Sequence, residues 1–171
     1  MTRCYTYIDT PLGRMLVQGD GYVVTGLLMP SHKRWPGLDA SWQRTDAPFA
    51  LVRSQLAEYF AGTRQQFDVP LQLDGTPFQQ QVWQELRRIP YGATISYAEL
   101  AARVGKPAAA RAVGHANGRN PIAVIVPCHR VIGTNGKLTG YAGGMDNKRW
   151  LLAWERRATT DPLFRSGQFH G

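Results

Sequence analysis

An apolar run, residues 122–126, leads directly into Pro127, Cys128, His129 and Arg130. A continuous apolar run of this length predicts a buried β-strand. Any fold of this chain must therefore hold a thiol, an imidazole and a guanidinium at the end of a buried element. Nearby cations favour the thiolate, which is the nucleophilic form of cysteine. The alternative is a buried structural cysteine, which is the more common role of a free thiol.

The net charge is unevenly distributed along the chain. Residues 1–74 hold seven basic and seven acidic side chains, whereas residues 75–157 hold 12 basic and four acidic ones and so carry the entire excess of +8. Such asymmetry favours a polyanionic partner, most often nucleic acid. A surface that is merely solubilising would not require a neutral first part.

The composition limits the class of protein. The chain has 171 residues, 43% of them hydrophobic, which is enough for one medium domain or two small ones with a true core. No stretch approaches the roughly 20 apolar residues of a membrane span, and the first residues lack the apolar core of a signal peptide. We therefore expect a cytoplasmic protein in which Cys4 and Cys128 are free thiols.

Residues 1–74 predict a β-rich domain with one helix. Phe49, Leu56 and Phe60 follow helical spacing, and Gly62 is a suitable helix end. Residues 30–48 predict a loop. Alternating residues between turn signals predict strands at 4–9, 15–17, 22–25 and 67–73.

Residues 75–157 predict a second, helical domain, and residues 158–171 a polar tail. Thr76 and Gln79 form a capping box at the start of a helix that Pro90 ends. Ser96 and Glu99 form another capping box, which opens a helix that continues to Val104.

A turn at 105–107 separates that helix from a short one at 108–116, which is the pattern of a helix-turn-helix. Any two packed helices can produce the same pattern. The second helix is rich in alanine, and Arg111 is the single long side chain of its first turns. A helix this slim favours close approach to a minor groove, or insertion of the arginine between bases, over base reading in the major groove.

These motifs together resemble the alkylguanine-DNA alkyltransferases, also called methylated-DNA–protein-cysteine methyltransferases. The resemblance covers roughly residues 76–155 closely and the first part of the chain more loosely. It rests on Ser96-Tyr97, Ala109 to Gly114, Asn120-Pro121, Ile125 to Gly133, Gly140 to Gly144, and Trp150 to Leu152 with Glu155.

The resemblance implies an α+β protein, in which a ribonuclease H-like N-terminal domain precedes a helical domain with a helix-turn-helix of winged-helix type. It implies direct-reversal repair of double-stranded DNA. Cys128 would accept one alkyl group from O6-alkylguanine, and from O4-alkylthymine as well. The product is a thioether that no motif here can cleave, so the protein would act once.

The resemblance also implies roles for individual residues. His129 would act as base through a water, Glu155 would orient His129, Tyr97 would donate a proton to the departing guanine, and Asn120 would hold the active-site turn. Arg111 would fill the gap left by the flipped nucleotide. DNA contacts would come from Arg111, Tyr97, Ala110, Ala112 and Gly114, and the base pocket from Val131, Tyr141, Ala142, Gly143 and Lys148.

No cofactor and no metal is expected. Some relatives bind zinc, but Cys4 and His32 are too few for a closed four-ligand site. We expect a monomer without membrane attachment, and leave open whether it binds DNA cooperatively and which alkyl groups it accepts. The effect of Asn117 on the pocket is also left open.

Four other functions compete with this interpretation. A lesion-binding protein that cannot accept the alkyl group would lack Cys128. A Cys-His hydrolase would not explain the basic part of the chain. A zinc nucleobase deaminase needs a second cysteine where Val131 stands. A helix-turn-helix regulator would explain the charge but not the buried thiol.

Overall fold

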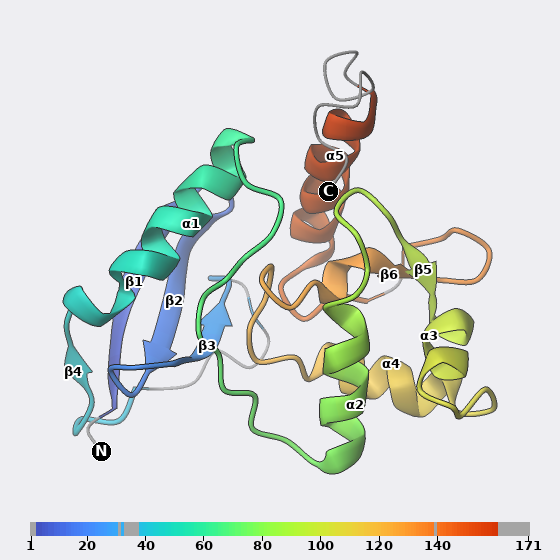
Figure 1. Ribbon diagram of the computed structural model, residues 1–171, viewed down its shortest axis with the longest axis horizontal. Coiled ribbons are helices and arrows are strands. Elements are labelled where there is room, and N and C mark those ends of the chain that lie inside the picture. Colours follow the sequence, from blue (N-terminus) through green and yellow to red (C-terminus); the bar gives the residue numbers. More distant parts are fainter. Residues whose placement is uncertain (1–2, 31, 33–37, 139, 161–171) are drawn as a thin grey trace.

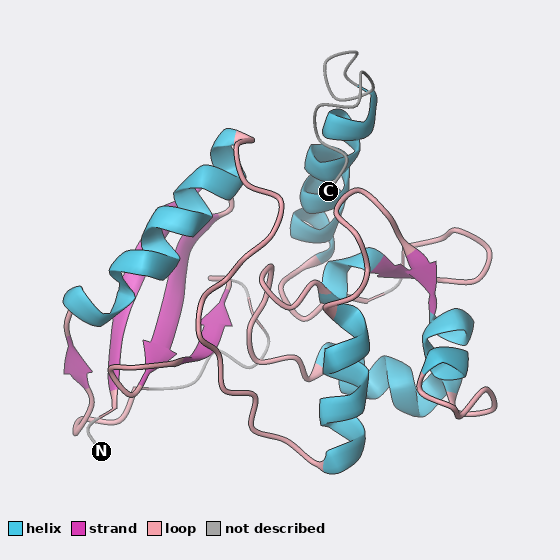
Figure 2. Ribbon diagram, in the orientation of Figure 1, coloured by secondary structure: helices cyan, strands magenta, loops and turns pink. Residues whose placement is uncertain are grey.

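The structure is a computed structural model that describes residues 3–30, 32, 38–138 and 140–160. A β-sheet with one helix across it forms the N-terminal part, and four helices gather in the C-terminal part (Figures 1 and 2). The expected α+β class is confirmed. Buried side chains from both parts, such as Val17, Leu56 and Leu86, belong to one continuous hydrophobic cluster. No helix in the described part of the chain has the length and apolarity needed to cross a membrane.

The sheet has the strand order β3-β2-β1-β4. Its three long strands are antiparallel, and β4 lies parallel to β1. Alternate residues of β1 are buried, as the sequence pattern indicates. The strands are β1 (Cys4–Thr10), β2 (Gly13–Gly19), β3 (Val24–Leu28) and β4 (Gln43–Arg44).

Two strand predictions need correction. The third strand begins at Val24 instead of residue 22. The strand expected at 67–73 is absent, and Leu71 makes only an isolated bridge to Val24. Pro70 explains this, because proline has no N–H with which to extend a ladder. In addition, the short strand β4 lies inside the segment 30–48 that was predicted as a loop.

Helix α1 (Ala50–Ala61) follows the short 3-10 helix η1 (Ala47–Phe49) and ends where the sequence predicts. Gly62 adopts φ = 84°, a left-handed conformation that glycine accepts without strain. The buried face of α1 carries Val52, Leu56 and Tyr59. In Figure 1 this helix lies across the sheet.

The predicted helix starts in the C-terminal part are largely confirmed. Helix α2 (Pro77–Leu86) has the full capping box of Thr76 and Gln79. Helix α3 (Tyr97–Arg103) is capped by the Ser96 side chain, although the Glu99 carboxylate bonds to Arg103. The second helix of the pair, α4 (Ala110–Gly118), begins two residues later than expected.

The sequence did not predict α5 (Met145–Thr160) as a helix. The expected domain boundary at residue 157 falls inside it, and residues 161–171 of the predicted tail lie outside the described residues. Two short parallel strands, β5 (Ile95–Ser96) and β6 (Val131–Ile132), join the start of α3 to the segment that follows Cys128.

Candidate active site

The apolar run before Cys128 is buried, but it is a tight turn and not the predicted strand. Ile122 bridges Leu27 of β3, and the backbone N–H of Val126 then bonds back to the Ile122 carbonyl at 3.1 Å. Val124 has φ = 69°, which is unfavourable for a β-branched residue. Strain of this kind persists where the surroundings over-determine the backbone, and it is common near active sites.

Asn120 holds this turn. Its amide nitrogen donates to the carbonyls of Val126 at 2.7 Å and Ile122 at 3.3 Å, and its amide oxygen accepts from the Ile122 N–H at 3.0 Å. Asn117, one helical turn earlier in α4, donates to the carbonyl of Cys128 at 3.3 Å. The end of α4 is thereby bonded to the backbone around the thiol.

Residues Cys128–Arg130 form a 3-10 helix, η2, and all three are buried. A 3-10 helix has three residues per turn, so consecutive side chains point in different directions around its axis. His129 and Arg130 both reach Glu155 of α5.

Glu155 is a buried carboxylate with several donors. Oε2 accepts from Tyr59 at 2.6 Å, His129 Nε2 at 2.8 Å and Arg130 Nη2 at 3.0 Å. Oε1 accepts from Arg130 Nε at 2.8 Å. Burial alone would raise the pKa of Glu155, but His129 and Arg130 hold it well below its usual range, so the group is ionised.

The imidazole of His129 is buried and favours its neutral form. Burial lowers the pKa of the ring, and the attraction of Glu155 offsets this only in part. The neutral ring donates from Nε2 to the carboxylate, which leaves Nδ1 as the acceptor. Nδ1 is buried and has no hydrogen-bond partner among the described residues.

The thiol of Cys128 is protonated at rest. Burial raises its pKa, and the opposing influences of Asn120, Tyr141 and Lys148 are smaller. Lys148 favours the thiolate, as expected of a nearby cation, but burial outweighs this effect. A nucleophile of this kind needs a base to remove its proton.

Lys148 lies behind the site. Its ammonium group donates to the Val131 carbonyl at 2.7 Å and lies 6.0 Å from the centre of the Tyr97 ring. Burial lowers the pKa of Lys148 to about 8, and Cys128 acts in the opposite direction once its thiol is ionised. Lys148 therefore contacts β6 and the start of α3, and its charge acts on the thiol.

A small cavity of about 10 Å³ lies beside Cys128. Tyr141, Ala142 and Gly143 line it as expected for a base pocket, whereas Val131 is fully buried and is not among the described lining residues. The described walls are formed by His32, Asn117, Gly118, Asn120, Ala123, Cys128, Gly140, Tyr141, Ala142 and Gly143.

The helix-turn-helix forms a surface next to this site. Arg111 and Ala112 are exposed on α4, Ala110 is half-buried, and Gly114 faces the Tyr97 ring. A groove of about 620 Å³ runs between Arg111, His115 and the start of α2. Sequence reasoning missed His115 and Arg119, which follow Arg111 at four-residue intervals and are also exposed.

Comparison with known proteins agrees with this geometry. Residues 4–73 match the model for the 6-O-methylguanine DNA methyltransferase ribonuclease-like domain, and residues 77–157 match its DNA-binding domain. A methylated-DNA–protein-cysteine methyltransferase of Mycobacterium tuberculosis is 52% identical over 92% of this chain and 95% of its own length. The chain belongs to the methylated-DNA–protein-cysteine methyltransferase family.

Two further relatives support the membership. The constitutive methyltransferase of Bacillus subtilis is 48% identical over 89% of this chain and 94% of its own length. The crystal structure of the Mycobacterium tuberculosis protein OGT in complex with DNA has a TM-score of 0.85 and 51% identity, and covers 90% of this chain and 93% of that one. The expected family and α+β fold are thus confirmed.

Proposed function

We propose that the protein repairs double-stranded DNA by moving one alkyl group from O6 of guanine to Sγ of Cys128. One observation carries this proposal. A protonated, buried thiol lies in the wall of a cavity, and the next residue is a neutral histidine with an unpartnered ring nitrogen. The Cys128 thiol becomes a nucleophile only when His129 removes its proton inside the site. This suits a thiol that reacts once.

The proposed step balances within the substrate and the chain. His129 Nδ1 takes the proton of Cys128 through a water, and the imidazolium is stabilised by the ionised Glu155. Sγ then attacks the alkyl carbon while the bond from that carbon to O6 breaks. Tyr97 donates a proton to the departing guanine, and the product is an S-alkyl cysteine.

Access to the base requires that the nucleotide leave the duplex, because its O6 atom is not reachable in the stack. The exposed Arg111 on the slim helix α4 would fill the gap that the base leaves, and Ala110, Ala112 and Gly114 would allow close approach to the minor groove. Its relative from Mycobacterium tuberculosis has been crystallised with DNA. We further propose that O4-alkylthymine is a second substrate and that the protein acts as a monomer.

The test is a duplex that carries one isotope-labelled O6-methylguanine. After incubation, mass spectrometry of the digested protein should find the label on Cys128, with no more than one methyl group per molecule. The matched control is Cys4, the other buried free cysteine. Cys4→Ser should still take up the label, whereas Cys128→Ser should not. Label on another residue, or repeated turnover, would refute the proposal.

A further inference from the structure

The cavity beside Cys128 is too small for a base. Its volume of about 10 Å³ accommodates about one water, and a purine is many times larger. At least one wall must therefore move before a flipped guanine can enter. The identity of that wall determines what the pocket accepts.

His32 is the one described lining residue that comes from the N-terminal part of the chain. All the others lie between Asn117 and Gly143. His32 is 8% exposed, and it bounds the same small space as Cys128. A substituent held against Sγ in so small a space must also approach His32.

The turn that carries His32 is firmly attached to the active-site segment. The His32 N–H bonds to the Met29 carbonyl at 3.0 Å, directly after β3. Within β3, the Leu27 N–H donates to the Pro121 carbonyl at 2.9 Å, and the Leu27 carbonyl accepts from the Ala123 N–H at 3.0 Å. The strand that precedes Met29 is therefore bonded on both sides of Ile122 to the active-site segment.

Another wall, the 140–144 loop, rests on a deformable side chain. A β-carbon at Gly143 would lie 2.7 Å from Met29 Sδ and 2.8 Å from Tyr141 Cε2, so the 140–144 loop packs tightly against Met29. Met29 is fully buried. Methionine is unbranched and adapts to changes in the space around it. The loop is also held by Asn147 Nδ2, which donates to the Gly143 carbonyl at 2.7 Å, so Met29 is the adaptable part of its support.

We propose that Met29 and His32 determine which O6 substituents the protein accepts. His32 is the wall that limits the size of the substituent, and Met29 is the adaptable support of the 140–144 loop as the base enters. This inference rests on the proposed alkyl transfer. It assigns a specificity-determining role to the N-terminal part of the chain.

The test compares two substrates in single-turnover reactions: duplex DNA with O6-methylguanine, and free O6-benzylguanine. The measured quantity is the ratio of the benzyl rate to the methyl rate. His32→Ala should raise this ratio about tenfold, which is the usual effect of a small change in pocket size. Met29→Leu, which keeps the volume but adds a branch, should lower it.

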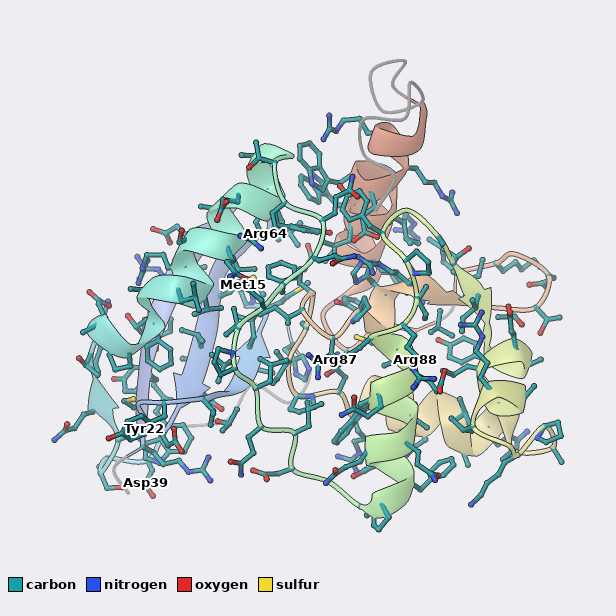
Figure 3. All side chains as sticks on the ribbon, in the orientation of Figure 1. Met15, Tyr22, Asp39, Arg64, Arg87 and Arg88 are labelled. Carbon is teal, nitrogen blue, oxygen red and sulfur yellow. The ribbon has the colours of Figure 1, made fainter. Side chains whose placement is uncertain are left out.

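The control is Tyr22→Ala. Tyr22 is 84% exposed, and Figure 3 places it on the N-terminal part, away from α2–α4. This variant should leave both rates unchanged. If His32→Ala does not fold, His32→Ser provides the same comparison with a small polar side chain, and its ratio should also rise.

An unchanged ratio in the folded His32 variants, or an equal fall of both rates, would overturn the inference, because a purely structural residue affects both substrates alike. The wild-type reaction with the same two substrates tests the proposed function separately. If the wild-type protein transferred neither group, alkyl transfer itself would be refuted.

Discussion

The hydroxyl of Tyr59 donates a 2.6 Å hydrogen bond to Oε2 of Glu155, although 96 positions separate the two residues. The same oxygen accepts from His129, and the carboxylate is further fixed by Arg130. Helix α1 of the N-terminal part is thereby bonded to the group that orients the proposed base. The N-terminal part thus contributes directly to the geometry of the site.

Tyr59→Phe should destabilise the protein. The substitution removes one hydrogen bond to a buried charged group, and such bonds contribute about 1.5–3 kcal/mol. Urea denaturation should show a loss of this size in the free energy of unfolding, and the alkyl-transfer rate should fall with it. Tyr22→Phe, at an exposed position, is the matched control and should change neither. Equal stability of the Tyr59 variant would mean that Arg130 and His129 alone fix Glu155.

Asn120→Ala should weaken the active-site turn and make the thiol less acidic. The side chain makes three hydrogen bonds to residues 122–126, so we expect a loss of about 2–4 kcal/mol of stability. Asn120 also lowers the pKa of Cys128, so its removal should raise that pKa and slow alkylation by iodoacetamide. Asn135→Ala, in an exposed turn, is the control. Unaltered thiol reactivity would contradict the role of Asn120.

Local signals predicted much of this fold. The capping box at Thr76, the cap at Ser96 and the glycine at 62 each depend on a few neighbouring residues, and each occurs where expected. Elements that depend on distant partners were less predictable. The 67–73 strand failed because Pro70 could not extend its pairing with Val24, and the 122–126 strand failed because Asn120 satisfies that backbone as a turn.

The site shows the same contrast. Motifs predicted a site formed by Cys128, His129 and Glu155, and the structure joins the last two by a hydrogen bond. Tyr59 and His32 were not predicted as site residues, because their proximity to Glu155 and the cavity arises only from packing of the two parts of the chain. The raised pKa of Cys128 was missed for a similar reason, since burial is a tertiary property.

Stability should fall as the pH drops below about 6.5. Burial lowers the pKa of His129 and of His32 in the folded protein, whereas both titrate near 6.5 in the unfolded chain. The unfolded state therefore binds more protons in this window, so full stability is present above about 6.5 and is lost below it. Each additional proton bound by the unfolded state lowers the free energy of unfolding by up to about 1.4 kcal/mol per pH unit.

Urea denaturation between pH 7.5 and 5 checks this dependence. His129→Gln should reduce the slope of unfolding free energy against pH, whatever its effect on stability at pH 7.5. The matched control is His115→Gln, because His115 is exposed on α4. Its slope should equal that of the wild type. A wild-type protein with flat stability over this range would show that the buried imidazoles do not resist protonation.

Arg111→Ala should impair repair of duplex DNA more than transfer from a free base. Arg111 is exposed on α4, whereas the bond from α4 to the Cys128 carbonyl comes from Asn117 at the far end of the helix. The guanidinium therefore has no part in activating the thiol. Its loss should raise the cost of flipping, which is a few kcal/mol, and leave a free substrate unaffected.

The measurement is the pair of single-turnover rates with duplex O6-methylguanine and free O6-benzylguanine. We expect the duplex rate of Arg111→Ala to fall at least about tenfold, since each 1.4 kcal/mol of added barrier is a factor of ten. Arg14→Ala removes an exposed arginine of β2 and should leave both rates intact. Equal losses on both substrates would mean that Arg111 supports the base pocket. The argument that α4 takes part in nucleotide flipping would then fail.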